Sequence, residues 1–541
     1  MPKSALKAKS VKWYSNCILR SNTNLHMKLF TKTNSKAGWR AIALCFCAAL
    51  VLTFGSCKHT KRSDMAQTIY EVNKNKAFNN VTEEGFSPVF QKILAEKKSS
   101  LKNPVLITSF YKDNGYDPVL VLDHMKGEDL KTFAVYLKKS GEHGLDPKIF
   151  QAEEINNLVN KFYSKDAIKT PEEAYETMAR LEVLLANSLI SYTNALQYGL
   201  ISPRKIYARY YTTTLRPDST SMKKVFGIAD MKTFLDSIQP KNPQYIALQK
   251  ALISKVQVPG KSAEETEHML KVNMERLRWK NKPSENKYVI VNIPDYRLDV
   301  MESGKSVMNM KVCVGEGRNI DKADKLMEYD ESDKTDRPFS RETPQLNSNI
   351  YTVQVNPVWN IPKSIATKEI MVSAAQDPYY LSNHNMAVYK GGKEVEDPET
   401  IDWSSAGPDD YEFKQRPGED NALGKIKFLF KNSSSVYLHD TPAKLAFDKT
   451  MRAVSHGCVR VERPLDLAHA LFGDGNKFQT IKSDMASGNP DPKDIALPNK
   501  VPVYLTYVTC WADESGALQF RPDVYGLDIV LLAHLDRFLT A

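Results

Sequence analysis

The hydrophobic periodicity of this chain changes once along its length, and this change constrains the fold more than any other feature. From about residue 65 to residue 280, apolar residues recur every three to four positions, which is typical of helices that bury one face. From residue 288 onward, apolar and polar residues alternate in short runs between turn residues, which indicates antiparallel strands. The 541 residues are enough for two or three domains with real cores. We therefore expect an α+β multidomain protein in which a helical region precedes a β-rich one.

Two helices of the first region carry clear start signals. Thr170-Pro171-Glu172-Glu173 is typical of a capping box with proline at the first helical position, and Gly199 is a fitting stop. A second capping box, Ser262-Ala263-Glu264-Glu265, begins a helix that we expect to connect the two regions. We interpret His143 and His268 as structural residues rather than ligands. The expected domains are a leader over residues 1–57, a helical domain over 65–260, a connecting helix within 261–286 and a β-rich domain over 287–541.

The second region shows hairpin patterns. Residues 288–293 and 296–301 alternate, and a turn at 303–306 leads into residues 307–314. Further along, residues 426–430 alternate, 432–435 form a turn, and the returning strand ends at His439. One more hairpin is expected over residues 501–520. Residues 365–422 are rich in Asp, Asn, Gly and Pro, and they predict a long excursion of the kind that forms a lid. Gly315-Glu316-Gly317 is interpreted as a plain turn.

The N-terminus has the pattern of an export signal. Nine Lys and Arg residues precede the apolar run over residues 41–54, and Gly55-Ser56-Cys57 follows. The run is shorter than the ~20 residues that span a bilayer. It resembles a bacterial lipoprotein signal, in which Cys57 is lipidated and becomes the mature N-terminus, with Met27 as a possible start. The alternative is an uncleaved N-terminal anchor. Both interpretations place the body of the protein in the periplasm, attached to a membrane.

Charge argues against nucleic acid as a partner. Without the nine basic residues of the leader, the remaining chain has 65 basic and 64 acidic residues, because no acidic residue precedes Asp64. Affinity for phosphates depends on clustered Lys and Arg, and this near balance removes the main support for it. Cysteine usage fits an exported protein. We expect Cys313 and Cys510 to be buried small hydrophobes rather than a disulfide, which leaves Cys458 as a free thiol.

The segment Ser455-His456-Gly457-Cys458-Val459-Arg460 contains what a thiol nucleophile needs. Cys458 supplies the sulfur, and a neighbouring imidazole can lower its pKa from about 8.5. His439 is the expected base, because its strand ends opposite the segment that carries the cysteine. His456 would share the face of Cys458 in an extended segment, and we favour a role for it in shaping the turn. Gly457 permits a tight backbone, and the amides around it are candidate oxyanion donors.

Two further questions stay open at the level of the residues. Arg460 either binds a substrate carboxylate or forms a structural salt bridge. A zinc site made of Cys458, His456 and His439 is conceivable, but no second nearby cysteine or paired-ligand spacing supports it. We expect no metal and no cofactor.

The hexapeptide around Cys458 is similar to the signature of L,D-transpeptidase catalytic domains, in which a cysteine replaces the serine of penicillin-binding enzymes. The resemblance covers nearly everything after the leader, and it is closest to the large, scaffold-bearing Gram-negative branch. The other motifs that carry it are Asn356-Pro357-Val358-Trp359-Asn360-Ile361-Pro362, Gln415-Arg416-Pro417-Gly418, Asn421-Ala422-Leu423-Gly424, Tyr437-Leu438-His439-Asp440-Thr441-Pro442, Asn273-Met274-Glu275-Arg276-Leu277-Arg278-Trp279 and Gly144-Leu145-Asp146-Pro147.

The resemblance implies a helical scaffold domain, a β-rich catalytic domain and a capping lid. It also implies an acyltransferase that attacks the third residue of a peptidoglycan tetrapeptide stem, releases D-alanine and holds an acyl-thioester on Cys458. An amine of a second stem then resolves the thioester into a 3→3 cross-link, with His439 as the base. The remaining residues that the resemblance points to are Ser455, His456 and Gly457 around the nucleophile and Arg460, Tyr437 and Trp359 at the substrate.

One departure from that branch concerns substrate capture. Members often insert a small peptidoglycan-binding module before the catalytic domain, but residues 249–261 leave no room for one. Capture would then rest on the lid, the scaffold or the membrane anchor. Two alternatives to a transpeptidase remain. One is a thiol carboxypeptidase or endopeptidase that trims stems with water as the acceptor, and the other is a non-enzymatic scaffold that tethers the membrane to the wall.

Overall fold

The computed structural model describes residues 62–317, 336, 338, 340–487 and 491–540. The expected leader, including Cys57, lies outside these residues. Within them, no helix combines the length and the hydropathy that crossing a bilayer requires.

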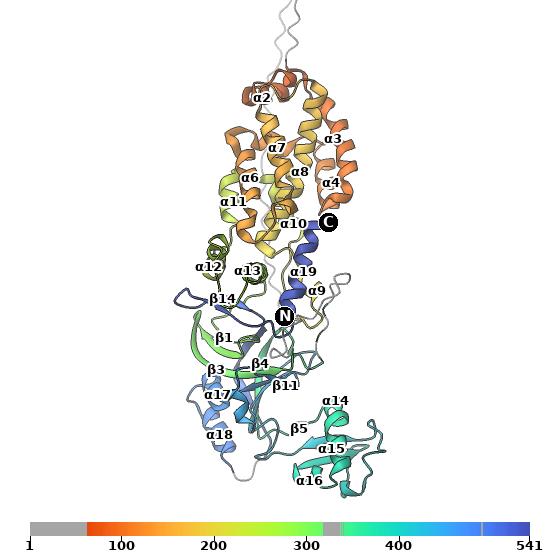
Figure 1. Ribbon diagram of the computed structural model, residues 1–541, viewed down its shortest axis with the longest axis vertical. Helices are drawn as coiled ribbons and strands as arrows, with labels where there is room; N and C mark the ends of the chain where they lie inside the picture. The colour runs from red at the N-terminus through yellow and green to blue at the C-terminus, as the bar shows by residue number, and fades with distance from the viewer. Residues whose placement is uncertain (1–61, 318–335, 337, 339, 488–490, 541) are drawn as a thin grey trace, which may run out of the picture. The chain divides into compact units, whose positions relative to one another are not determined.

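The helical region is built around one long helix, α8 (Pro171–Tyr198), which is buried along most of its length. Its N-cap forms as predicted, since Thr170 Oγ1 accepts from the Glu173 amide at 3.2 Å. The Glu173 carboxylate, however, accepts from the Lys169 amide at 2.9 Å, so the expected capping box is only half formed. The other helices of this region are α2 (Asp64–Asn73), α3 (Glu83–Lys97), α4 (Pro104–Asp113), α5 (Val119–His124), α6 (Asp129–Lys138), α7 (Ala152–Tyr163), α10 (Ser219–Lys223) and α11 (Met231–Ser237) (Figure 1).

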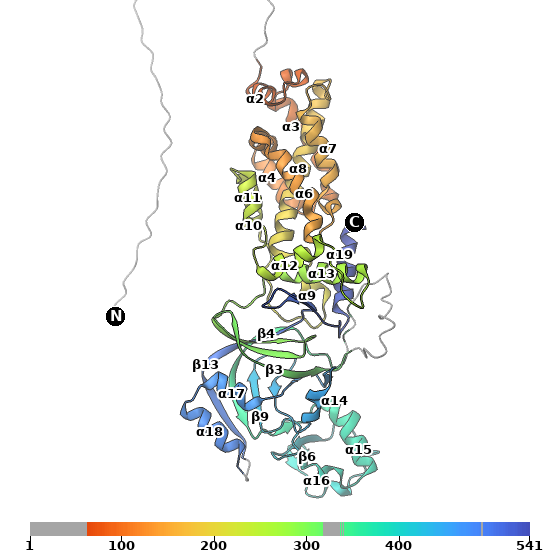
Figure 2. The ribbon, with the colours of Figure 1, turned by 60° about the vertical axis from the view of Figure 1, so that its left-hand side comes forward.

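Three helices lead from this region to the sheet: α9 (Pro203–Ile206), α12 (Pro243–Ile253) and α13 (Ala263–Arg278). The capping box predicted for α13 is complete, because Ser262 Oγ accepts from the Glu265 amide and the Glu265 carboxylate accepts from the Ser262 amide. Only residues 254–262 separate α12 from α13. Figure 2 shows both helices between the long helices and the sheet. His143 is buried here and hydrogen-bonds the Tyr245 hydroxyl at 3.0 Å, which is a structural role.

A nine-stranded sheet follows, with the order β11-β3-β12-β10-β9-β4-β13-β1-β2 and an additional β2–β3 pairing that closes it on itself. Its strands are β1 (Lys287–Asn292), β2 (Arg297–Glu302), β3 (Lys305–Gly315), β4 (Leu346–Val355), β9 (Ile426–Phe430), β10 (Leu438–His439), β11 (Ala453–Ser455), β12 (Val459–Val461) and β13 (Lys493–Thr506). The predicted hairpins β1–β2, β2–β3 and β9–β10 are all present. The predicted C-terminal hairpin forms within residues 501–520, between β14 (Cys510–Ala512) and β15 (Leu518–Phe520), and β13, which ends at Thr506, is a separate strand.

The excursion predicted from residues 365–422 is a small ordered subdomain between β4 and β9. It has its own sheet, with the order β5 (Trp359–Asn360), β8 (Glu412–Gln415), β6 (Met386–Lys390) and β7 (Lys393–Glu394). Its helical elements are α14 (Lys363–Ile365), the π-helical turn η8 (Ala366–Ile370), α15 (Met371–Gln376) and α16 (Tyr380–Asn383). A separate hydrophobic cluster around Trp403, Phe413 and Val388 forms its core. We call residues 356–425 the lid.

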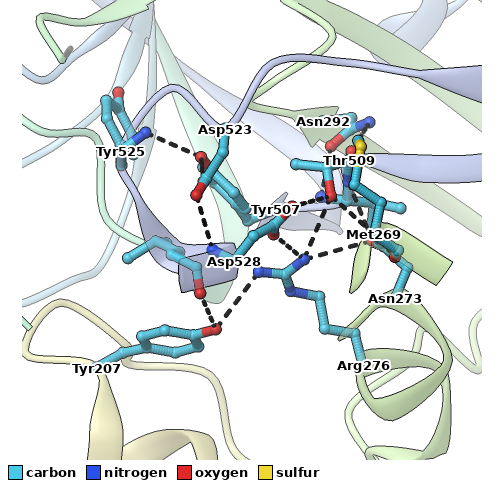
Figure 3. A network of polar contacts seen from close by, with 12 residues as sticks. Tyr207, Met269, Asn273, Arg276, Asn292, Tyr507, Thr509, Asp523, Tyr525 and Asp528 are labelled. Carbon is cyan, nitrogen blue, oxygen red and sulfur yellow. Dashed lines mark hydrogen bonds and ion pairs between the residues drawn. The ribbon is translucent and has the colours of Figure 1, made fainter. Parts of the chain in front are cut away.

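A buried polar network joins α13 to the last helix of the chain (Figure 3). Arg276 of α13 lies 2.5 Å from Asp528 of α19 (Leu527–Thr540), and their side chains are only 5% and 12% exposed. The other Asp528 oxygen accepts from the Thr509 hydroxyl at 2.7 Å. Burial and the neighbouring Asp528 raise the pKa of Asp523 to about 7. The members of this network come from regions far apart in the sequence. The network therefore ties α13 to the segment that follows β13.

Candidate active site

One face of the large sheet packs on its hydrophobic core, and the other face carries polar side chains. Core residues in the strands around the nucleophile are Val312, Val314, Val353, Val355, Ile426, Phe428, Leu438, Val459 and Val461. The residues that alternate with them point to the opposite face, because successive side chains of a strand alternate.

Strand register aligns six of these opposite-face residues in one row across β3, β12, β10, β9, β4 and β13. The row is Cys313, Arg460, His439, Lys427, Gln354 and Asp494. Tyr437 lies two residues before His439, and Cys458 directly precedes β12. The two segments are joined by the Val459 amide, which donates to the Tyr437 carbonyl at 3.1 Å. The fold therefore brings the nucleophile candidate, the base candidate and Arg460 to the same face of the sheet.

A tight turn presents Cys458 immediately before β12. Gly457 has a φ of 114°, a conformation that side-chain-bearing residues rarely adopt. Ser455 Oγ accepts from the Gly457 amide at 3.1 Å and donates to the Cys458 carbonyl at 2.6 Å. The Thr343 hydroxyl donates to the Gly457 carbonyl at 2.8 Å. Side chains on both sides thus hold the turn.

The backbone amides of this turn differ in how they are used. The Gly457 amide is bonded to Ser455 Oγ, whereas the Cys458 amide has no acceptor among the described residues. Of the two predicted oxyanion donors, Cys458 is therefore the one whose N–H is free to bind an oxyanion.

Gly315 also supports the turn, and our interpretation of it as a plain turn was wrong. A Cβ there would lie 1.8 Å from the Arg341 carbonyl oxygen, so glycine permits a close backbone contact.

The Cys458 thiol is half-buried and close to several polar groups. Burial raises its pKa, while hydrogen bonds from the Tyr437 amide and hydroxyl and the charges of Arg460 and Lys427 act in the opposite direction. The net result is a raised pKa, so the resting sulfur is a protonated thiol. The surrounding donors and cations nevertheless stabilise a thiolate once the proton leaves.

His439 is buried, with only 5% of its surface exposed. Burial, with the charge of Arg460, lowers its pKa to about 3, so the imidazole is neutral at ordinary pH. Nδ1 lies 2.5 Å from the Asp440 carbonyl oxygen, which fixes Nδ1 as the protonated nitrogen and leaves Nε2 as a free acceptor. Cys458 and His439 share no hydrogen bond among the contacts of the described residues. A rotation of the thiol away from Tyr437 is needed before Nε2 can take its proton.

His456 lies in a different environment. The positive φ of Gly457 breaks the extended path on which His456 would share the face of Cys458. Its Nε2 instead lies 2.7 Å from Glu369 in the π-helical turn of the lid. Glu369 also pairs with Arg341, which in turn pairs with Glu316. The histidine therefore links the nucleophile turn to the lid, consistent with the shaping role that we favoured for it.

Three residues predicted to meet the substrate surround the thiol. Arg460 has no ion pair or hydrogen bond within the described part of the chain, and its Nε is buried without a partner. The alternative of a structural salt bridge thus has no acidic partner there. Tyr437 is held by the indole N–H of Trp359, and burial and the nearby Cys458 raise its pKa. Trp359, at the start of the lid, is therefore in contact with the nucleophile through Tyr437.

Sequence reasoning missed Lys427, Glu369 and Arg341. Lys427 could not have been placed from the predicted hairpin alone, because closing a turn at residues 432–435 would pair residue 428 with His439, whereas the observed register pairs Lys427 with it. Glu369 and Arg341 had no local signal, since His456 and Glu369 are 87 residues apart. Cys313 and Cys510 are buried free thiols, which confirms that they are not paired. No group of three or more His, Cys, Asp or Glu side chains in the described ranges is arranged to hold a metal ion.

Comparisons with known proteins agree with this geometry. A family model described as the L,D-transpeptidase catalytic domain, named YkuD, matches residues 286–472. A second model, described as a scaffold domain, matches residues 105–252. A protein of Haemophilus influenzae described as a putative L,D-transpeptidase is 29% identical over 372 residues, which cover 66% of this chain and 70% of that protein.

Proposed function

Because this chain belongs to the L,D-transpeptidase family and carries that family's scaffold domain, we propose that it forms 3→3 cross-links between peptidoglycan stem peptides. The donor is a tetrapeptide stem, and the bond that breaks joins its third residue to the terminal D-alanine. The acceptor is the side-chain amine of the third residue of a second stem. The reaction passes through an acyl-enzyme on Cys458.

The observation that carries this proposal is the setting of His439. A general base must be unprotonated and oriented before the substrate arrives. Burial keeps this imidazole neutral, and the bond from Nδ1 to the Asp440 carbonyl leaves Nε2 as the acceptor. Asp440 is itself held by the Lys425 amide at 3.0 Å and the Lys444 ammonium at 2.5 Å. Such a fixed, neutral base on the strand beside a thiol suits acyl transfer.

Acylation follows from these positions. Nε2 of His439 takes the thiol proton, and the Cys458 sulfur attacks the carbonyl carbon of the third stem residue. The oxyanion that forms is stabilised by the Cys458 amide, and the nearby charges of Arg460 and Lys427 favour the developing negative charge. The imidazolium then gives its proton to the leaving amine, and D-alanine departs. A thioester and a neutral His439 remain.

Deacylation reverses the proton movements with a different nucleophile. The amine of the second stem attacks the thioester carbonyl and gives a proton to His439. The sulfur leaves as the thiolate, which the imidazolium reprotonates. Water would compete at this stage, and cross-linking therefore depends on its exclusion. The contact between Glu369 of the lid and His456 is a means of holding the lid over the acyl-enzyme.

Recognition of the donor rests on charge. Arg460 is a guanidinium whose Nε is buried and unpartnered beside His439, and a free substrate carboxylate supplies the anion that it lacks. We assign Arg460 to that role.

We also propose that the protein is exported to the periplasm and anchored through lipid on Cys57. The support is the basic segment, the apolar run and Gly55-Ser56-Cys57 of the leader. Mass spectrometry of the mature N-terminus from a native membrane fraction tests this. A diacylated Cys57 peptide agrees with the proposal, whereas an intact leader would indicate an uncleaved anchor.

The enzymatic proposal is tested with a soluble form that starts near residue 65. It is incubated with disaccharide-tetrapeptide, and D-alanine and a cross-linked dimer are measured by mass spectrometry. We expect both products from the wild type, none from Cys458→Ala, and wild-type amounts from the control Cys510→Ala, which removes a buried thiol away from the site. Tripeptide without dimer would identify a hydrolase. Absence of any turnover by the wild type would favour a non-enzymatic scaffold.

A further inference from the structure

Lys427 belongs to the same row across the sheet as His439 and Arg460. It lies in β9 directly opposite His439 in antiparallel register, just as Arg460 lies opposite His439 on the other side in β12. Its neighbours Ile426 and Phe428 belong to the hydrophobic core, so the lysine points to the same face as the nucleophile. Two cations therefore flank the base, one strand away on either side.

The charge of Lys427 has no partner of its own. Among the described residues, the ammonium makes no ion pair and no hydrogen bond, and its nearest assigned contact is the Tyr437 ring at 5.5 Å. Asp494 is the acidic residue of the row, but Gln354 lies between it and Lys427. The Gln354 amide donates to the Asp494 carboxylate at 2.7 Å. Cys458 is the other titratable group that influences the lysine.

A half-buried cation without an anion is costly, and burial lowers the pKa of Lys427 accordingly. Strands otherwise place apolar residues at such positions. Unpartnered charges of this kind are typical of functional sites, where the ligand supplies the missing partner. Arg460 shows the same property on the opposite side of His439.

The spacing of the two cations sets what they can bind. Adjacent strands lie about 4.8 Å apart, so residues on β9 and β12 are separated by roughly 10 Å across β10. The two cations therefore extend from opposite sides of His439, and each can take a carboxylate of its own. Under the proposed function, the donor stem carries two free carboxylates near the scissile carbonyl. One is the terminal carboxylate of D-alanine, and the other is on the side chain of a diamino-diacid third residue.

We propose that Lys427 is a specificity-determining residue that binds one free carboxylate of the donor stem, on the opposite side of His439 from Arg460. The inference rests on the proposed function and extends it, because it states that the enzyme requires two anionic groups on its donor. A stem whose carboxylate is amidated keeps its shape but loses this contact, so the site discriminates acid from amide stems.

The test combines protein variants with amidated substrates. The variants are Lys427→Met, which keeps the length of the side chain, and Lys427→Arg, which keeps the charge. Lys431→Met is the matched control, because this exposed lysine directly follows the same strand. Four donor tetrapeptides are compared: both carboxylates free, only the terminal one amidated, only the side-chain one amidated, and both amidated. The measured quantity is kcat/KM for D-alanine release.

We expect Lys427→Met to lower kcat/KM about 10- to 100-fold for the diacid donor, the range of a charge-assisted hydrogen bond. On one of the two monoamides the same variant should cause only the smaller loss, common to all donors, that follows from removing a cation near Cys458, and that monoamide identifies the bound carboxylate. Lys427→Arg should retain most of the discrimination, and Lys431→Met should match the wild type. An equal loss on all four donors would overturn the proposal, since it would mean that Lys427 acts only on Cys458 or His439.

A binding experiment separates this inference from the proposed function. The four peptides are titrated into Cys458→Ala, with and without Lys427→Met, by calorimetry. Loss of affinity for the diacid but not for one monoamide supports the carboxylate contact even if the wild type shows no turnover. Equal affinity of Cys458→Ala for acid and amide peptides, with or without Lys427, would overturn it. Circular dichroism of each variant checks that the fold is retained.

Discussion

Removing Arg276 should destabilise the protein strongly and in a pH-dependent way. The guanidinium and Asp528 are both almost fully buried, and Asp523 lies beside them. Arg276→Met leaves two neighbouring buried carboxylates without a cation. Breaking a buried pair in this way costs about 3–5 kcal/mol, so we expect a loss of about 4 kcal/mol in the free energy of unfolding at pH 7.5.

The pH dependence follows from Asp523. Its folded pKa, about 7, lies above its ordinary value, so the folded state binds the extra proton as the pH falls through 7. This contribution to stability is lost as the pH rises through 7. Arg276 lowers that pKa, and its removal makes proton uptake more favourable. Between pH 7.5 and 5.5 the wild type itself gains about 2 kcal/mol by protonating Asp523, and the variant, whose pKa is higher, gains about 2.7 kcal/mol, so the deficit shrinks by about 1 kcal/mol.

Urea unfolding followed by tryptophan fluorescence measures the effect, because Trp279 caps α13 beside the network. Lys271→Met is the control from the same helix, since it removes only a surface pair with Glu267 and should cost under about 1 kcal/mol. Adding Asp528→Leu to Arg276→Met should restore about 2 kcal/mol, because one of the two uncompensated carboxylates, and its repulsion of Asp523, is gone. Equal costs for Arg276→Met and Lys271→Met, or a further loss in the double variant, would refute the reasoning.

Three further predictions concern the candidate active site. His439→Ala should lower kcat about 10²- to 10⁴-fold, and His456→Ala should have a much smaller effect in the same D-alanine assay; the reverse order would exclude His439 as the base. Gly457→Ala should cost about 1–3 kcal/mol in urea unfolding, because its φ of 114° strains any side chain, and a neutral effect would contradict that geometry. Glu369→Gln should weaken the contact between lid and nucleophile turn and raise the ratio of tripeptide to dimer, and an unchanged ratio would show that this contact does not exclude water.

The hairpin that carries His439 shows how far local patterns reach. Alternation in residues 426–430 and turn residues at 432–435 predict both strands, but closing that turn directly gives a register one residue away from the observed one. The pattern therefore places His439 at a strand end, whereas the pairing of Lys427 with it comes only from the structure. The connecting helix was equally readable, because the Ser262 capping box depends only on residues within one turn.

Contacts between distant segments could not be predicted in the same way. Arg276 and Asp528 are 252 residues apart, and nothing near either residue indicates its partner. Gly315 looks like any turn glycine until the Arg341 carbonyl is placed against it. At Thr170 the local rule was correct for one hydrogen bond and wrong for the other, because Glu173 has Lys169 and Lys161 as competing partners.

The point at which the lid leaves the sheet has a structural consequence. Val355 and Ile426, which bound the lid, are directly paired in adjacent antiparallel strands. Their Cα atoms are therefore about 5 Å apart, a gap that a short hairpin loop closes. The lid also has its own hydrophobic cluster and sheet. A short loop between Val355 and Ile426 can therefore replace the whole lid without moving the strands that hold the thiol and the imidazole.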